Sequence, residues 1–96
     1  MSISSQNPIN NRLTGQAVGS AGSMGANCRE ANNSLGKKDF LHNRMKIARK
    51  ESKEVIHWLI LLREANNVDY CEEIIACLNE AQELKNIFSA IISKCG

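Results

Sequence analysis

The residue types best suited to chemistry in this chain are four cysteines and two histidines: Cys28, Cys71, Cys77, Cys95, His42 and His57. No two cysteines are spaced as CxxC, and neither histidine stands at a ligand spacing from a cysteine, so the pattern does not favour a zinc site. We expect four reduced thiols, some of them acting as small core residues. No metal or other cofactor is expected.

Catalytic motifs are also missing from the sequence. It contains no GxxxxGK[ST], GxGxxG, GxSxG or HExxH pattern. Cys28 has no recognisable base near it in sequence, and Glu72-Glu73 is typical of the first turn of a helix, where carboxylates complement the helix dipole. We therefore expect a protein that is not an enzyme and takes no small-molecule substrate.

The charged residues are unevenly distributed along the 96 residues. The whole chain has 12 Lys and Arg against 10 Asp and Glu, a net charge of +2. Residues 37–53 alone have a net charge of +5, and residues 54–96 one of −4. The cations of the basic segment are Lys37, Lys38, Arg44, Lys46, Arg49, Lys50 and Lys53. Such a segment can contact nucleic-acid phosphates, or it can pair with the acidic segment of a neighbouring subunit.

Hydrophobic periodicity predicts an all-α fold. Its three helices cover about residues 12–34, 37–66 and 70–95. Residues 1–11 are polar and are expected to form a tail or lead-in, and residues 12–96 a single domain. The chain has no apolar run long enough to cross a bilayer, and residues 1–20 lack the features of a signal peptide, so a cytoplasmic location is expected.

The positions expected to face the core recur at three- and four-residue spacing in each helix. In the first they are Leu13, Ala17, Ser20, Ser23 or Met24, Asn27 and Ala31. In the second they are Leu41, Met45, Ala48, Ser52, Val55, Leu59 and Leu62. In the third they are Ile74, Cys77 or Leu78, Ala81, Leu84, Phe88, Ile91 and Cys95. The small residues of the first helix predict a close approach to its neighbour.

A polar stripe follows the first predicted helix, formed by Ser20, Ser23, Asn27 and Glu30. If it faces inward, its groups need hydrogen-bond partners. The candidates on the second helix are Lys38, Arg49, Ser52 and Glu54. If it faces outward, it is a solvated surface.

Four segments in this order resemble a known family: Ser23–Ala31 (SMGANCREA), Lys37–Phe40 (KKDF), Ile47–Glu54 (IARKESKE) and Trp58–Leu62 (WLILL). They are similar to the bacterial four-helix-bundle proteins encoded by intervening sequences of 23S ribosomal RNA genes. The similarity extends from about Gln16 to Ile92. The motif positions that carry it are Ser23, Asn27, Glu30, Phe40, Ser52, Glu54 and Trp58.

This resemblance implies an up-down antiparallel four-helix bundle that assembles into a homo-oligomeric ring, with a pentamer as the expected form. Relatives include the accessory protein of diversity-generating retroelements, a basic ring that binds nucleic acid and the reverse transcriptase. RNA, DNA or a protein are thus candidate partners. The family has a long helix before the segment corresponding to residues 13–16, where this chain has only residues 1–11. The first helix is therefore expected to be short or missing, which would leave apolar surface for a partner chain to cover.

Overall fold

The computed structural model describes residues 8–33, 37–65 and 71–95. They form three helices, α1 (Pro8–Asn32), α2 (Lys38–Ala65) and α3 (Cys71–Cys95), and no strand. None of these three helices combines the length and the apolar character that a membrane-spanning helix requires. The all-α prediction is confirmed, whereas a fourth helix is not found among the described residues.

The first helix begins earlier than the sequence predicts. Residues 8–11, which were expected to belong to the tail, are part of α1, and the side chain of Asn10 is fully buried. Proline is well tolerated at the start of a helix because the first turn needs no intrahelical N–H donors, and its fixed φ suits the helix. At the other end, the Asn33 N–H donates to the carbonyl oxygens of Arg29 and Glu30 and closes the last turn.

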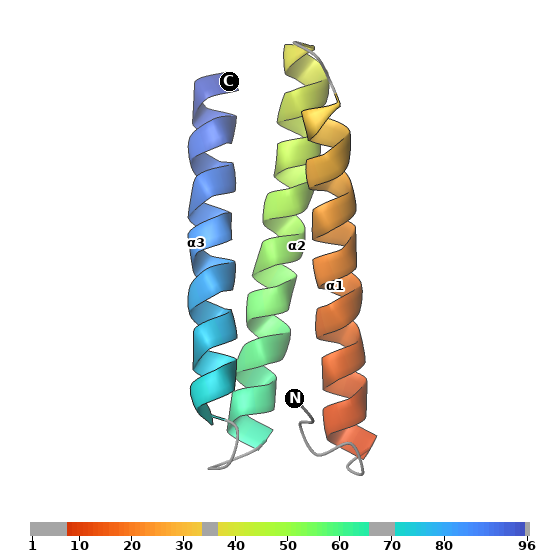
Figure 1. The fold of residues 1–96 in the computed structure, drawn as a ribbon, viewed down its shortest axis with the longest axis vertical. Helices are drawn as coiled ribbons and strands as arrows, with labels where there is room; N and C mark the ends of the chain where they lie inside the picture. The colour runs from red at the N-terminus through yellow and green to blue at the C-terminus, as the bar shows by residue number, and fades with distance from the viewer. Residues whose placement is uncertain (1–7, 34–36, 66–70, 96) are drawn as a thin grey trace.

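The second helix is the centre of the molecule because it has an apolar stripe wide enough to serve two neighbours. Its buried residues are Met45, Ala48, Ser52, Val55, Leu59 and Leu62. The Leu41 N–H donates to the carbonyl of Lys37 at 2.9 Å, so α2 starts where the predicted second helix does. Both α1 and α3 pack against α2 and run antiparallel to it (Figure 1).

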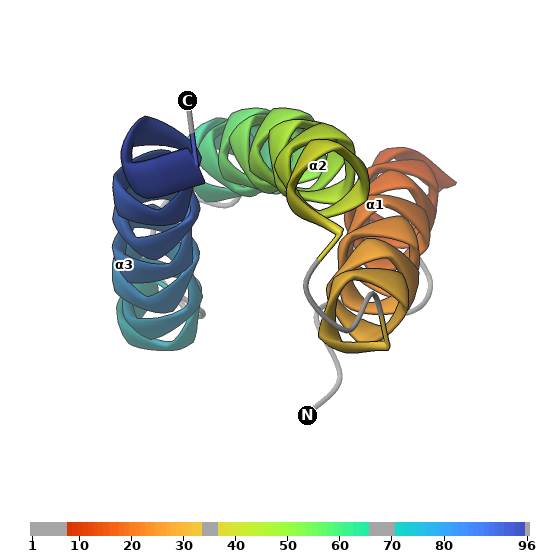
Figure 2. The same ribbon diagram turned by 90° about the horizontal axis from the view of Figure 1, so that it is seen from above.

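Seen along its length, the molecule is an arch, with α2 at the apex and α1 and α3 as the two sides (Figure 2). Among the described residues, no Cα atom of α1 lies within 8 Å of a Cα atom of α3. In a closed four-helix bundle each helix has two neighbours. Here α1 and α3 each have one, and the place between them opposite α2 is open.

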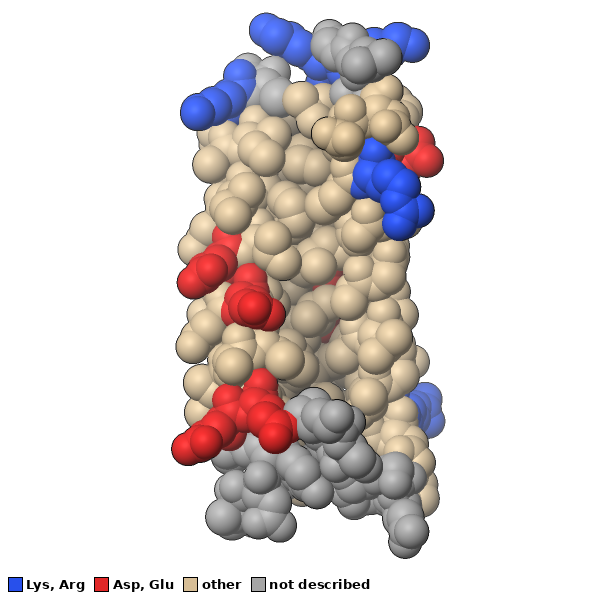
Figure 3. Space-filling view, viewed as in Figure 1, with Lys and Arg blue, Asp and Glu red and all other residues tan. Residues whose placement is uncertain are grey.

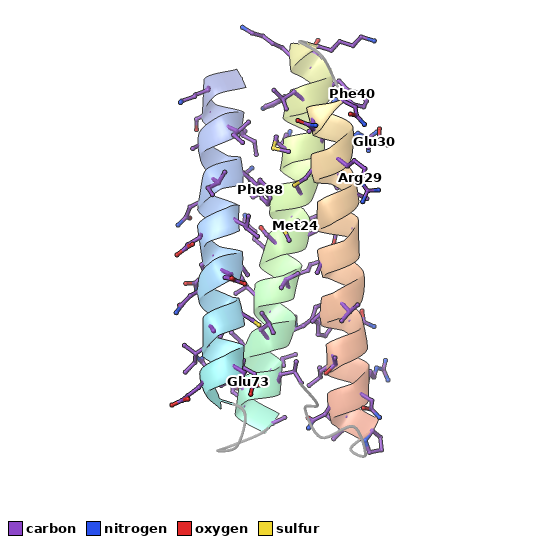
Figure 4. The ribbon with its side chains drawn as sticks, in the orientation of Figure 1. Met24, Arg29, Glu30, Phe40, Glu73 and Phe88 are labelled. Carbon is purple, nitrogen blue, oxygen red and sulfur yellow. The ribbon has the colours of Figure 1, made fainter. Side chains whose placement is uncertain are left out.

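The core consists of two clusters along the arch. Near the ends where α2 finishes and α3 starts, Val55, Leu59 and Leu62 pack against Ile74, Leu78 and Ala81. Nearer the other end lies a second cluster, with buried members Ala31, Met45, Ala48 and Phe88. Met24 of α1 packs against this cluster, to which Phe88 of α3 belongs (both are labelled in Figure 4). Leu78 rather than Cys77 occupies the core position of α3, because Cys77 is exposed.

Small residues on α1 do allow it to lie close to α2, as predicted. Ala17, Ser20 and Ala31 are buried in the interface. The glycines of α1 do not contribute to this approach, since a Cβ added at any of Gly15, Gly19, Gly22 or Gly25 would meet nothing within 4 Å.

Candidate nucleic-acid interface

Three lysines form a continuous basic stripe on the outer side of α2. Lys46, Lys50 and Lys53 are spaced by four and three residues, which places them on one face of the helix. All three are exposed, on the side of α2 away from its buried residues. None makes an ion pair with a described residue. His57, also exposed, continues the stripe by four residues.

The other four cations predicted to contact phosphate are placed differently. Lys37 and Lys38 are exposed at the start of α2, about two turns from Lys46. Arg49 is half-buried beside the stripe. Arg44 is also half-buried and donates a hydrogen bond to Asn27 of α1. The structure thus groups three of the seven predicted cations on one face.

Arg44 belongs instead to a polar network between α1 and α2. Its Nη1 donates to Asn27 Oδ1 at 3.2 Å, and its Cζ lies 5.0 Å from the centroid of the Phe40 ring, a cation–π distance. Asn27 Nδ2 in turn donates to the backbone carbonyl of Ser23 at 2.9 Å. Ser23 Oγ donates to Glu51 Oε2 at 3.0 Å. The chain from Glu51 through Ser23 and Asn27 to Arg44 holds the two helices in register.

The predicted polar stripe therefore faces inward at Ser20, Ser23 and Asn27, and its inward part is scaffold. The partners that the structure gives it on α2 are Glu51 and Arg44, not the four residues that the sequence suggested. A helical wheel with the correct register would have found both, because each lies at the same edge of the α2 core face.

The motif residues Ser52, Glu54 and Trp58 are buried or half-buried on α2. Ser52 is fully buried and its Oγ donates to the backbone carbonyl of Arg49 at 2.6 Å. Trp58 is half-buried, its ring meets His57 edge-on at 4.9 Å, and its Nε1 has no hydrogen-bond partner among the described residues. Glu54 is half-buried.

Glu30, the outer member of the predicted stripe, is exposed at the end of α1. With Asn33, Lys37 and Phe40 it lines a small hollow where α1 and α2 meet. The side chains of Glu30 and Phe40 lie at the same end of the molecule, as do Arg29 and the start of α2 (Figure 4). Glu30 is thus outside the buried network, in contrast to Asn27.

Acidic side chains gather on α3, on the opposite flank of the arch from α1. Glu72, Glu73, Glu80 and Glu83 are all exposed. The side of the molecule that looks between α1 and α3 shows these carboxylates over α3, and no Lys or Arg in its middle (Figure 3). The basic and acidic segments of the sequence therefore become separate faces of one molecule.

The described thiols and histidines belong to no metal-binding group, and the two free thiols among them differ in exposure. No group of three or more His, Cys, Asp or Glu residues that could hold a metal ion occurs in the part of the chain that the structure describes. Cys28 and Cys77 are free thiols, the first half-buried and the second exposed. Desolvation by burial raises the pKa of the Cys28 thiol, which makes it a poorer nucleophile at neutral pH.

Comparison with known families agrees with the motif resemblance. A family model described as 23S rRNA-intervening sequence protein matches residues 3–90, a range that includes all of α1 and α2 and most of α3. The chain belongs to this family. Neither the comparison with curated proteins nor that with solved structures found a match. In this member of the intervening-sequence family, the motif residues Ser23 and Asn27 connect α1 to α2, and Ser52 is buried in α2.

Proposed function

We propose that this intervening-sequence family member is a non-enzymatic helical protein that assembles into a homo-oligomeric ring and contacts nucleic acid weakly through the outer face of α2. The observation that carries the proposal is the stripe formed by Lys46, Lys50 and Lys53, exposed and without an ion-pair partner among the described residues. Flexible lysines on a convex helix suit phosphate oxygens and do not read bases. Binding is therefore proposed to be independent of sequence.

Separate charged faces support the ring. A contact between two different surfaces of the same protein is heterologous, and such contacts close into rings when the rotation allows. The acidic face of α3 and the exposed cations Lys37 and Lys38 at the start of α2 are different surfaces of complementary charge, and neither includes the lysine stripe. A pentamer is the form that the family resemblance implies.

The test is a salt titration of binding to a fluorescently labelled RNA duplex. Three phosphate contacts predict a slope of roughly −2.7 for log affinity against log salt, which corresponds to a loss of about 40-fold between 50 and 200 mM. Changing Lys46, Lys50 and Lys53 together to Gln should abolish that slope. The matched control changes three exposed cations elsewhere, Arg12→Gln, Arg63→Gln and Lys94→Gln, which alters the net charge equally. If both triple variants lose affinity equally, the stripe is not the interface.

A second candidate function is a purely structural or protein-interaction module without nucleic-acid binding, in which the lysine stripe pairs with α3 of the next subunit. The exposed carboxylates of α3 favour it. Light scattering of the same two triple variants separates the two functions. A fall in mass with the stripe variant, and no RNA binding by the unaltered protein, would establish the structural role and exclude the first proposal.

A further inference from the structure

The open side of the arch forms an apolar groove between α1 and α3. The cavity has a volume of about 290 Å³, and its floor is the α2 stripe of Val55, Leu59 and Leu62. Its lining on α1 extends from Thr14 to Met24. Ten residues of helix correspond to about 15 Å, or about three turns, so the groove is long and narrow rather than a closed pocket.

The side chains in the middle of both walls of the groove are mostly short. On α1 the wall is made by Ala17, Val18 and Ala21 with Met24 beyond them, and on α3 by Cys77 and Ala81 with Glu80 beside them and Leu84 beyond them. Short side chains on both walls let another helix come within the 8–10 Å that separates packed helix axes. A helix lying here would contact α1, α2 and α3 together.

Apolar side chains at the groove remain in water in the isolated chain. Val18 is 65% exposed, and Ile87, which continues the groove-facing side of α3 beyond the lining residues, is 52% exposed. Large exposed apolar surface that is continuous with a groove is typical of a binding site, whereas single exposed apolar residues are not. An amphipathic helix laid in an apolar groove is a recurring mode of protein recognition.

Acidic residues along the α3 edge of the groove restrict which kind of helix can bind there. Glu73 and Glu80 lie seven residues apart on the groove side of α3, so they follow the same edge two turns apart. Glu73 lies near the lower end of the groove (Figure 4). The opposite wall, on α1, has no charged residue from Thr14 to Met24. The complementary helix is therefore apolar at its centre and basic along one flank only.

A second copy of this chain does not supply such a helix from its described residues. The basic helix, α2, has its apolar stripe buried against α1 and α3, and its one large exposed apolar residue is Ile47. Helix α3 is acidic, and the two cations of α1, Arg12 and Arg29, lie 17 residues apart with none between them, so neither helix offers a basic flank. The occupant that fits is thus a helix of different sequence.

We propose that the groove is the docking site for an amphipathic helix of a different protein, about three turns long, with Lys or Arg along the flank that meets α3. The helix completes a four-helix arrangement and covers the α2 floor. This inference does not depend on the proposed nucleic-acid contact, because the lysine stripe lies on the other side of α2.

The test uses the full chain and two synthetic probes. One is an 18-residue alanine-based peptide with leucines at core-facing spacing and lysines along one flank, and the other has glutamates in place of the lysines. Both are labelled with fluorescein, and binding is followed by anisotropy at low and high salt. The lysine probe should bind at least tenfold more tightly than the glutamate probe at low salt, and the difference should shrink at high salt. Bound lysine probe should also protect Cys77 from alkylation, measured at that residue by mass spectrometry.

Two matched substitutions locate the binding. Val18→Arg puts a long cation into the groove at an exposed position, so it should lower the affinity for the lysine probe at least tenfold without unfolding the protein. Ile47→Arg makes the same kind of change at an exposed apolar residue on α2 outside the groove and should leave affinity unchanged. Circular dichroism checks that both variants keep their helices.

Three results would overturn the inference. The two probes could bind equally well, or the bound lysine probe could leave Cys77 fully reactive. Alternatively, Cys77 could be protected from alkylation without any probe, while light scattering gives twice the mass of one chain and Val18→Arg restores the mass of one chain. The last result would mean that a second copy fills the groove.

Discussion

Asn27→Ala is expected to destabilise the protein by about 2.5 kcal/mol, because this side chain connects both helices of the α1–α2 pair. Asn27 is 9% exposed, accepts a hydrogen bond from Arg44 and donates one to the Ser23 carbonyl. A neutral hydrogen bond contributes about 1 kcal/mol net, and one to a charged group about 1.5–3 kcal/mol. We take the lower value for Arg44, since it is half-buried and water can replace part of the lost contact.

The substitution is informative because losing the Asn27 side chain leaves the Arg44 guanidinium with fewer hydrogen bonds. Its Nε is already buried without a hydrogen-bond partner in the described part of the chain. Removing the Asn27 oxygen takes away the contact made by Nη1, so the guanidinium keeps only its stacking on Phe40. A change of 2.5 kcal/mol corresponds to a fall in Tm of roughly 10–20 °C for a domain of this size.

Urea unfolding followed by circular dichroism measures the effect, with Asn43→Ala as the matched control. Asn43 is exposed on α2, so the control should lie within about 0.5 kcal/mol of the unaltered protein. A double-mutant cycle of Asn27→Ala with Arg44→Met should give a coupling of about 1–2 kcal/mol, because the two residues are in direct contact. If Asn27→Ala is as mild as the control, or the coupling is absent, the network does not hold the helices together.

Further expectations follow from burial and from missing contacts. Gly19→Ala should raise the free energy of unfolding by about 0.5–1 kcal/mol, since the new Cβ meets nothing within 4 Å. A lower free energy of unfolding in urea would instead mean that another chain packs against the Gly19 face of α1. Leu62→Ala, at a side chain 1% exposed, should cost about 2–5 kcal/mol in the same assay, and a loss below 1 kcal/mol would contradict the core assignment. Trp58→Phe should cost under about 1 kcal/mol despite the size of the residue, because the indole Nε1 has no hydrogen bond to lose; a larger cost measured by thermal unfolding would reveal a partner for it. The raised pKa of Cys28 means that the folded state holds its thiol proton more tightly than the unfolded state, so the free energy of unfolding should fall as the pH rises past the ordinary thiol pKa. The fall should be smaller in Cys28→Ala, and identical pH profiles would rule out this linkage.

Sequence periodicity was sufficient for the elements and for most of the core. The seam of α2 is strongly periodic, and six of its seven predicted positions are buried, with Leu41 half-buried. The helical nature of α1 was also predictable, although its glycines oppose it, because its small residues recur at helical spacing. Its start at Pro8 was missed, since a polar segment with a proline is more often a turn than a first helical turn.

The candidate sites were only partly predictable. The basic segment was evident from composition, but composition does not say which side chains share a face. Helical geometry puts Lys46, Lys50 and Lys53 together, while packing against α1 draws Arg44 into a hydrogen bond with Asn27. Ser23 likewise meets Glu51 because of how far α1 is shifted along α2. The spacing of residues within one helix does not determine that shift.

The sequence by itself determined the all-α class, the family and the separation of charge along the chain, because these depend on local periodicity and on residues close together in the chain. Only the tertiary structure decided that α1 and α3 both pack on α2 and leave a groove between them. The physical reason is that a helix with an apolar stripe can bury it against any complementary surface. Which surface it meets, and which one stays open, depends on the sum of contacts between segments distant in sequence.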